Sequence, residues 1–267
     1  MKLVIIAPRG KMGRLIVQSG AKRDSFEWIA GVAPKGGEYI GMDLGDVAMV
    51  GHPLGVPVVD DLENVIDQCD MVIDFSTKEC SLQVLDCALR HKKALICGTT
   101  GFDAEEMKRF QKASQEIPLL FAANTSKMVN LMQEILAVAA KALKDQVDVE
   151  ILEMHDRQKR DVPSGTAKEM GETIAHAQHK ELDECAVFGR AVGENPRQAG
   201  TIAFHSVRAG NWPSSHTVIF GGMGERLEIS HHAYDWVCFA EGACDAAVFL
   251  WKKEAGFYTM KDVLQQT

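Results

Sequence analysis

Residues 3–13, LVIIAPRGKMG, indicate more clearly than any other stretch how this chain folds. The apolar run Leu3 to Ala7 predicts a short buried strand, and the glycines after it predict a turn into a helix. Backbone N–H groups at such a turn can approach a pyrophosphate at the positive end of the helix. Because Ala7 replaces the usual first glycine, a plain strand–turn–helix is an equal alternative for this stretch alone. The candidate phosphate-binding residues are Ala7, Arg9, Gly10, Lys11, Met12 and Gly13.

Further apolar runs, each followed by a polar or glycine-containing turn, extend this pattern along the chain. Apolar strands that alternate with helical stretches predict a parallel α/β sheet. Ligands bind such sheets beyond the carboxyl ends of the strands, where the turns Gly98–Gly101 and Asn124–Ser126 fall. The predicted strands are residues 28–32, 71–75, 94–97 and 119–123, with a helix at residues 81–91.

The pattern changes after about residue 127. A long helix is predicted at residues 129–144, and the strand-like segments after it lie close together, which favours a mixed or antiparallel sheet. An apolar face predicts a last helix at residues 239–253. The strand-like segments are residues 147–154, 202–209, 216–221 and 226–232.

Composition excludes several classes of protein. With 46% hydrophobic and 25% charged residues, the 267-residue chain is typical of a globular protein with an ample core. A net charge of −8 argues against nucleic acid as a partner, and no apolar run is long enough to span a membrane. The first apolar run is too short for a secretory signal. Seven scattered cysteines without a Cys-x-x-Cys pair predict reduced thiols in the cytoplasm and no metal site.

The run from Glu153 to Ala167 contains the candidate chemistry. His155, a proton carrier near neutral pH, stands four residues before the cation of Lys159. Pro163 then introduces a turn, Ser164–Gly165–Thr166, whose free N–H groups at a helix start would bind a carboxylate. These parts suit an acidic small molecule that is gripped and protonated. A polar loop that caps a surface helix is the equal alternative from composition alone.

The end of the second predicted strand bears on cofactor choice. NAD enzymes usually place a carboxylate there for the ribose hydroxyls, but the segment 31–35 has none and ends in Lys35. A cation without the carboxylate favours a ribose 2′-phosphate, and therefore NADPH over NADH. The alternative is that Lys35 is an ordinary solvated charge.

An ordered set of motifs runs through nearly the whole chain. It resembles the 4-hydroxy-tetrahydrodipicolinate reductase (dihydrodipicolinate reductase) family of the lysine and diaminopimelate pathway. The motifs are Gly10-x-Met12-Gly13, Asp74-Phe75-Ser76, Gly98-Thr99-Thr100-Gly101-Phe102, Ala122-Ala123-Asn124-x-Ser126, Val129-Asn130, the run from His155 to Ala167, the run from His205 to Gly210, His216-Thr217-Val218, Gly224-Glu225, Phe239-Ala240-x-Gly242-Ala243, and the run from Gly256 to Leu264.

The resemblance implies a homotetramer that reduces a cyclic imine dicarboxylate with NADPH or NADH. It implies a Rossmann-type dinucleotide-binding domain at residues 1–126 and an α+β substrate and tetramerisation domain at 127–235. A C-terminal segment, 236–267, would pack back on the first domain. By motif position, His155 matches the acid/base histidine and Lys159 the catalytic lysine, and Ser164, Gly165 and Thr166 match the turn that binds a substrate carboxylate. Phe75, Gly98, Thr100 and Ala123 match the loops beside the nicotinamide, and we place Thr99 and Asn124 with them as cofactor-binding candidates.

Two departures from the family pattern fall among the candidate substrate-binding residues. Asp156 stands where the family has a second histidine, and Trp236 stands where it has a substrate-holding arginine. Losing the arginine removes a bidentate carboxylate clamp, and an added carboxylate would repel the substrate. The main hypothesis remains the family's reaction. The alternatives are a paralogue that reduces a monocarboxylate or hydroxylated ring, and a non-catalytic NADP-binding sensor.

We interpret the other notable polar residues as structural. His205, His216, His231 and His232 lie in strand-like segments, where a satisfied structural histidine is the commoner case. Arg208 is interpreted as a structural or interface residue. Asp161 is expected to cap the turn before Ser164.

Overall fold

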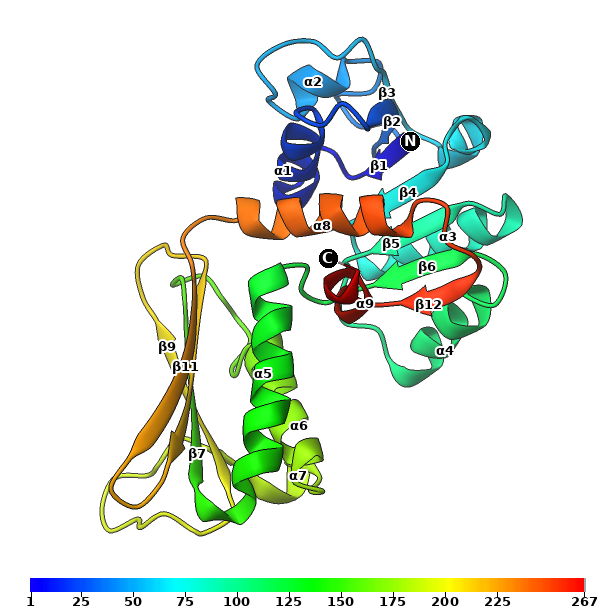
Figure 1. Ribbon diagram of the computed structural model, residues 1–267. Coiled ribbons are helices and arrows are strands. Elements are labelled where there is room, and N and C mark those ends of the chain that lie inside the picture. Colours follow the sequence, from blue (N-terminus) through cyan, green and yellow to red (C-terminus); the bar gives the residue numbers. More distant parts are fainter. Residues whose placement is uncertain (267) are drawn as a thin grey trace. The chain divides into compact units, whose positions relative to one another are not determined.

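The computed structural model describes residues 1–266, which form two compact units. The first unit comprises Met1–Lys127 together with the chain from Trp236 onward, and the second comprises Met128–Asp235. Each unit has its own sheet (Figure 1). No helix within residues 1–266 combines the length and apolarity needed to cross a membrane.

The sheet of the first unit is wholly parallel, as the alternating pattern predicts. Its strand order is β12-β6-β5-β4-β1-β2-β3. Residues 94–97 were predicted with the observed bounds, four other predicted strands differ from the observed ones by one or two residues at their ends, and β3 and β12 were not predicted. The strands are β1 (Lys2–Ile6), β2 (Glu27–Val32), β3 (Val58–Val59), β4 (Met71–Asp74), β5 (Ala94–Cys97), β6 (Pro118–Phe121) and β12 (Gly256–Tyr258).

Helices cover both faces of this sheet, so its central strands are buried on both sides. Leu3 and Ile5 of β1 pack in the core that includes α1 and α8, whereas Val4 and Ile6 pack in the core that includes α3 and α4. In Figure 1, α8 lies beside α1. The helices are α1 (Lys11–Gly20), α2 (Leu44–Val47), α3 (Lys78–Arg90), α4 (Ala104–Ala113), α8 (Val237–Leu250) and α9 (Met260–Gln265), with 3₁₀ turns η1 (Leu62–Asn64) and η2 (Ile66–Gln68).

The second unit has a mixed sheet in the order β11-β10-β7-β9-β8, which confirms the predicted sheet type. Strands β7, β9 and β8 are parallel neighbours, whereas β10 is antiparallel to β7 and β11. The elements are α5 (Lys127–Leu143), η3 (Lys144–Gln146), β7 (Asp148–His155), α6 (Gly165–Ala177), α7 (Leu182–Cys185), β8 (Ala186–Phe188), β9 (Ile202–Arg208), β10 (Ser214–Gly221) and β11 (Arg226–Ala233).

One face of this second sheet packs against α5 and α6 (Figure 1). Successive residues of a strand point to opposite faces, and burial along β7 alternates accordingly from Val149 to His155. Val149 and Ile151 therefore join the core, and the same periodicity places Glu153 and His155 on the same face. The predicted strand ended at residue 154, whereas His155 is the last residue of β7. Glu153 and His155, two polar residues, thus extend the core-facing side of β7 beyond its apolar residues.

Candidate functional site

The turn between β1 and α1 is shaped by the residue that replaces the expected glycine. Ala7 adopts a positive φ of 54°, and its carbonyl accepts a hydrogen bond from the Gly10 N–H at 3.0 Å. A Cβ on Gly13 would lie 2.2 Å from that carbonyl oxygen, so only glycine allows the helix to approach this closely. Gly10 caps α1 without a side-chain hydrogen bond, and no acidic residue occupies the first turn. The turn therefore retains the features that suit a phosphate.

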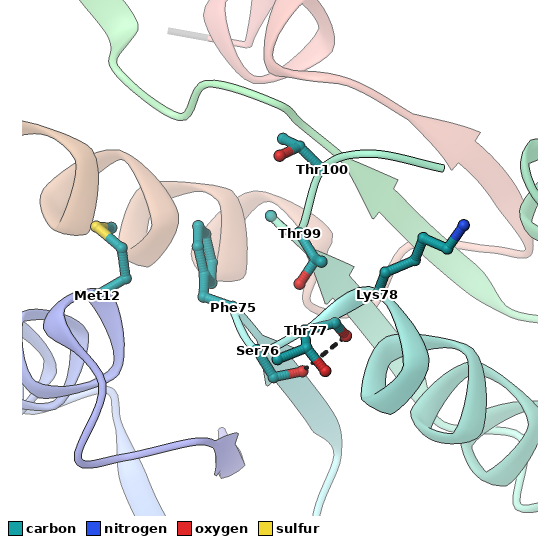
Figure 2. A pocket seen from close by; sticks show the side chains of 8 residues that line it. Met12, Phe75, Ser76, Thr77, Lys78, Thr99 and Thr100 are labelled. Carbon is teal, nitrogen blue, oxygen red and sulfur yellow. Dashed lines mark hydrogen bonds between the residues drawn. The ribbon is translucent and has the colours of Figure 1, made fainter. Parts of the chain in front are cut away.

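A cavity of about 260 Å³ lies beside this turn in the first unit. It collects residues that follow three different strands, as expected for the carboxyl edge of a parallel sheet (Figure 2). Five predicted cofactor-binding residues line it together, whereas Ser76, Thr77 and Lys78 were not predicted, although they form the polar turn directly after a predicted strand. The lining residues are Met12, Phe75, Ser76, Thr77, Lys78, Gly98, Thr99 and Thr100.

Two buried contacts shape this cavity. The ring of Phe75 lies so close to Gly98 that a Cβ there would be 2.0 Å from it. Asp74 is fully buried at the end of β4, and the N–H and hydroxyl of Ser76 donate to its Oδ1 at 3.0 and 2.5 Å. Burial raises the pKa of the Asp74 carboxyl. Asp74 and Gly98 thus fix the positions of the Ser76 turn and the Phe75 ring.

The remaining cofactor candidates do not line this cavity. Ala123 and Asn124 follow β6, where the Asn124 side chain accepts a hydrogen bond from the Ser126 N–H at 2.9 Å. The Arg9 guanidinium lies 5.3 Å from the Tyr39 ring centre and 3.9 Å from a Glu38 oxygen. Lys35 Nζ is 3.8 Å from an Asp61 oxygen, and its side chain is 79% exposed.

Trp236, predicted as a substrate-binding residue, lies in the first unit beside Lys11 of the candidate phosphate-binding turn. Its ring centre is 3.9 Å from Lys11 Nζ, a cation–π contact, and 5.4 Å from the ring centre of Phe239. The contact joins a candidate substrate residue to a candidate cofactor residue. Sequence reasoning placed these two residues in separate groups, because Lys11 matches the family's pyrophosphate turn and Trp236 its substrate-holding arginine.

The second unit buries a connected group of charged residues around His155. The His155 Nδ1 atom lies 2.6 Å from Glu153 Oε2. Both residues are buried, with 6% of His155 and 0% of Glu153 exposed. Arg208 donates to both Glu153 oxygens at 2.7 Å. Burial opposes ionisation, but hydrogen bonds from His155 and Arg208 hold the pKa of the Glu153 carboxyl far below its usual range. Glu153 is therefore an anion in a buried position.

Strand register explains why these residues meet. In the parallel pair β7–β9, His155 is opposite Arg208, and in the antiparallel pair β7–β10, Glu153 is opposite His216. Sequence reasoning assigned Glu153 no role, interpreted Arg208 as a structural or interface residue, and interpreted His216 as structural. The one available signal was the two-residue spacing of Glu153 and His155, which puts both on one face of a strand.

His216 connects this group to the predicted anion-binding turn. Its ring packs edge-on against His155 with centres 5.2 Å apart, and its Nε2 lies 3.2 Å from the Ser164 hydroxyl oxygen. Burial and the nearby His155 lower the pKa of His216 to about 3, so His216 is neutral. Ser164 is the N-cap of α6 and accepts a hydrogen bond from the Ala167 N–H at 3.2 Å.

Lys159 and the anion-binding turn share one carboxylate. Lys159 Nζ lies 2.7 Å from Asp161 Oδ1, and the Gly165 N–H donates to Asp161 Oδ2 at 3.3 Å. Partial burial opposes ionisation of the Asp161 carboxyl, but the hydrogen bond from Lys159 lowers its pKa overall. Asp161 thus caps this turn, as the sequence predicted, and it does so where a substrate carboxylate was expected to bind.

Asp156, the departure from the family's second histidine, also has a local partner. Its Oδ1 accepts a hydrogen bond from the Gln158 N–H at 2.7 Å, and its carbonyl oxygen accepts one from the Lys159 N–H at 3.3 Å. This is the side-chain turn that aspartate commonly forms with its own backbone. Asp156 therefore shapes the loop that presents Lys159.

A group that includes potential metal ligands lies on the first unit, away from these residues in sequence. Glu63, Cys87 and His91 place ligand atoms within 4.8 Å of one another. However, the His91 nitrogens already lie 2.7 Å from Asp67 and 2.9 Å from Glu63. Burial raises the pKa of the Cys87 thiol to about 11, which opposes the thiolate that a metal needs. The contacts of His91 with Glu63 and Asp67 account for the closeness of these side chains without a metal.

Two family models together match nearly the whole chain. A model described as the N-terminus of dihydrodipicolinate reductase matches residues 1–125, and one described as its C-terminus matches residues 128–264. The chain belongs to the dihydrodipicolinate reductase family. It is an oxidoreductase of that family, and residues 1–125, which carry most of the Rossmann-type first unit, correspond to the family's N-terminal, NAD(P)-binding module.

Curated relatives and solved structures agree with this family. The chain is 41% identical to a 4-hydroxy-tetrahydrodipicolinate reductase from Hahella chejuensis, over 98% of each chain. It is 42% identical to one from Pseudomonas fluorescens, again over 98% of each. A solved dihydrodipicolinate reductase from Paenisporosarcina sp. TG-14, bound to dipicolinate, has a TM-score of 0.77 at 25% identity over 98% of each chain. A probable dehydrogenase from Thermotoga maritima, 9% identical with a TM-score of 0.63, shares the fold.

Proposed function

We propose that this chain reduces 4-hydroxy-tetrahydrodipicolinate to tetrahydrodipicolinate in lysine and diaminopimelate biosynthesis. The observation that carries the proposal is a group of residues in the second unit. There, two carboxylates link a buried histidine and a lysine to the predicted anion-binding turn. Glu153 bonds to His155 and Ser164, and Asp161 bonds to Lys159 and Gly165. The names of the 41–42% identical relatives support the same reaction.

Each residue has a distinct role in this proposal. A bound nicotinamide dinucleotide supplies the hydride. The glycine turn before α1 and the cavity lined by Phe75, Gly98 and Thr100 hold that cofactor. The Ser164–Thr166 turn binds a substrate carboxylate, which takes the place of Asp161. Lys159 stabilises the negative charge that hydride addition creates, and His155 donates the proton.

Steady-state turnover tests the reaction directly. With enzymatically generated 4-hydroxy-tetrahydrodipicolinate and NADPH, we expect a kcat/KM of about 10⁴ M⁻¹s⁻¹ or higher. A value orders of magnitude lower, restored by Trp236→Arg combined with Asp156→His, would instead support the paralogue with a different ring substrate. Tight NADPH binding without turnover on any cyclic imine or enone acid would support the non-catalytic sensor.

We also propose that the protein is a homotetramer, as the family resemblance implies, and that it is located in the cytoplasm. Light scattering of the same preparation tests the oligomeric state, and cell fractionation tests the location.

Cofactor preference is a separate part of the proposal, and we propose NADPH over NADH. The acid partners of Arg9 and Lys35 lie 3.9 and 3.8 Å away, Arg9 also contacts the Tyr39 ring, and both side chains are mostly exposed. They are therefore able to turn toward a ribose 2′-phosphate. Glu38 and Asp61 are the nearest carboxylates to them, and a ribose diol held by either one would favour NADH instead.

Lys35→Ala is expected to raise the KM for NADPH about fivefold, because one exposed cation near a phosphate contributes about 1 kcal/mol. The KM for NADH should stay within twofold. The measurement is kcat/KM for both cofactors in wild type and variant at low ionic strength, where such contacts are strongest. Lys22→Ala, another exposed lysine of the first unit, is the matched control and should change neither value. An unchanged NADPH KM in Lys35→Ala would contradict this role.

A further inference from the structure

Both carboxylate oxygens of Glu153 have hydrogen-bond partners within the second unit. Its Oε2 lies 2.6 Å from His155 Nδ1 and accepts from Arg208 Nη1 at 2.7 Å. Its Oε1 accepts from Arg208 Nη2 at 2.7 Å and from the Ser164 N–H at 3.2 Å. Glu153 is 0% exposed, and replacing a whole buried ion pair by apolar residues of similar volume is often neutral or stabilising. A buried ion pair is therefore weak evidence of a purely stabilising role, and it invites a functional explanation.

We propose that Glu153 and Arg208 are a positioning pair that fixes the tautomer of His155 and holds the anion-binding turn beside it. This inference rests on the proposed role of His155 as the acid. Because Arg208 can only donate, both Glu153 oxygens act as acceptors, and His155 Nδ1 must therefore carry a hydrogen. The remaining nitrogen, Nε2, is then the atom that releases the proton to the substrate.

This arrangement makes the proton transfer simple. His155 begins as an imidazolium with hydrogens on both nitrogens. The Nε2–H bond breaks, the proton moves to the substrate atom that gains electron density after hydride addition, and its bonding pair stays on Nε2. The neutral ring that results keeps its Nδ1–H bond to Glu153, so no partner has to rearrange. Glu153 stays ionised throughout, because Arg208 neutralises it.

The same pair connects all three parts of the proposed substrate site. Ser164, which begins the anion-binding turn, donates its N–H to Glu153. Arg208 Nη2 also donates to the backbone carbonyl of Asp161, the residue that pairs with Lys159. The acid, the anion-binding turn and the loop of Lys159 are therefore fixed relative to one buried ion pair.

Glu153→Gln is the decisive substitution. An amide oxygen at the Oε1 position can still accept from Ser164 and Arg208, and the amide nitrogen then faces His155. That nitrogen donates to Nδ1, which forces the neutral ring to carry its hydrogen on Nε2. We expect kcat to fall about 10- to 100-fold, with the substrate KM and the NADPH Kd within threefold of wild type. Arg208→Lys keeps Nδ1 as the donor, so its kcat should fall less.

The chain offers a matched control three residues earlier on β7. Glu150 also bonds to a histidine and an arginine, His205 and Arg190, but it lies on the opposite face of the strand. Glu150→Gln changes the same kind of glutamate contact with a histidine and an arginine, in a group without a proposed role in the reaction. We expect its kcat to stay within twofold of wild type.

Ring ¹⁵N NMR of histidine-labelled protein tests the tautomer without any substrate. Comparison with His155→Gln assigns the signal, which should report Nδ1–H in the neutral wild-type ring and Nε2–H in Glu153→Gln. A wild-type Nε2–H tautomer, or a Glu153→Gln enzyme with near-native kcat, would overturn the inference. If Glu153→Gln fails to fold, the wild-type spectrum and Arg208→Lys still decide. An inert wild type with Nδ1–H would reject the proposed reaction but leave the positioning pair standing.

Discussion

Lys159→Ala is expected to lower kcat on 4-hydroxy-tetrahydrodipicolinate by about a hundredfold or more, because it removes both a cation and a hydrogen-bond donor. His155→Ala should have an effect of similar size, since it removes the proton. Neither change should alter the Kd for NADPH by more than about twofold, because neither residue lines the candidate cofactor cavity. Stopped-flow hydride transfer and NADPH fluorescence titration measure the two quantities.

The Asp161 carboxylate complicates a single substitution at Lys159. Without Lys159, Asp161 keeps only its contacts with the turn and becomes an unpaired anion where the substrate carboxylate should bind. The double variant Lys159→Ala with Asp161→Asn removes that repulsion. We expect the double variant to recover substrate KM but not kcat, because the missing cation still matters in the transition state.

Lys141→Ala, an exposed lysine of α5, is the control for loss of a charge from the second unit. Its kcat should match that of wild type. A Lys159→Ala enzyme with near-native kcat, or a double variant that recovers kcat fully, would show that Lys159 serves binding or structure and not the chemical step.

Gly242→Ala is expected to destabilise the first unit strongly. A Cβ at this position of α8 would lie 1.8 Å from the Thr125 carbonyl oxygen and 2.8 Å from its carbon. Backbone atoms cannot rotate away as a side chain can, so α8 or the Thr125 turn would have to move. That turn is also tied to α8 by the bond from Thr125 Oγ1 to the Phe239 carbonyl at 2.7 Å. Overpacking of this kind costs about 3 kcal/mol, against a gain of about 1 kcal/mol in helix propensity.

Thermal unfolding measures this effect. A net loss of about 2 kcal/mol should lower the Tm of the first unit by roughly 4–8 °C. Gly221→Ala is the control, because its Cβ would meet only the Asp148 carbonyl oxygen, at 3.9 Å. Its Tm should change little. If the Gly242→Ala protein has the wild-type Tm, the close packing of α8 against the Thr125 turn is not as described here.

Local sequence determined much of this protein. Apolar runs separated by turns and helical stretches predict a parallel sheet, because strands buried on both faces need uninterrupted hydrophobic residues. The turn residues around Gly98 were found for the same reason, since the carboxyl ends of parallel strands share one edge. The sequence also predicts His155 and Lys159 as catalytic residues, because a proton carrier stands four residues before a fixed cation. The family resemblance supplied the reaction, which composition and periodicity alone do not specify.

Tertiary structure decided how the candidate residues are connected. Glu153, Arg208 and His216 come from three strands, and only their register places an arginine opposite His155 and a histidine opposite Glu153. Lys11 meets Trp236 because the C-terminal segment belongs to the same unit as the first strand. Periodicity specifies which face a side chain occupies, but it does not specify which distant strand will be its neighbour. That choice depends on the packing of both sheets, because buried charges are stable only where pairing brings their partners within hydrogen-bonding distance.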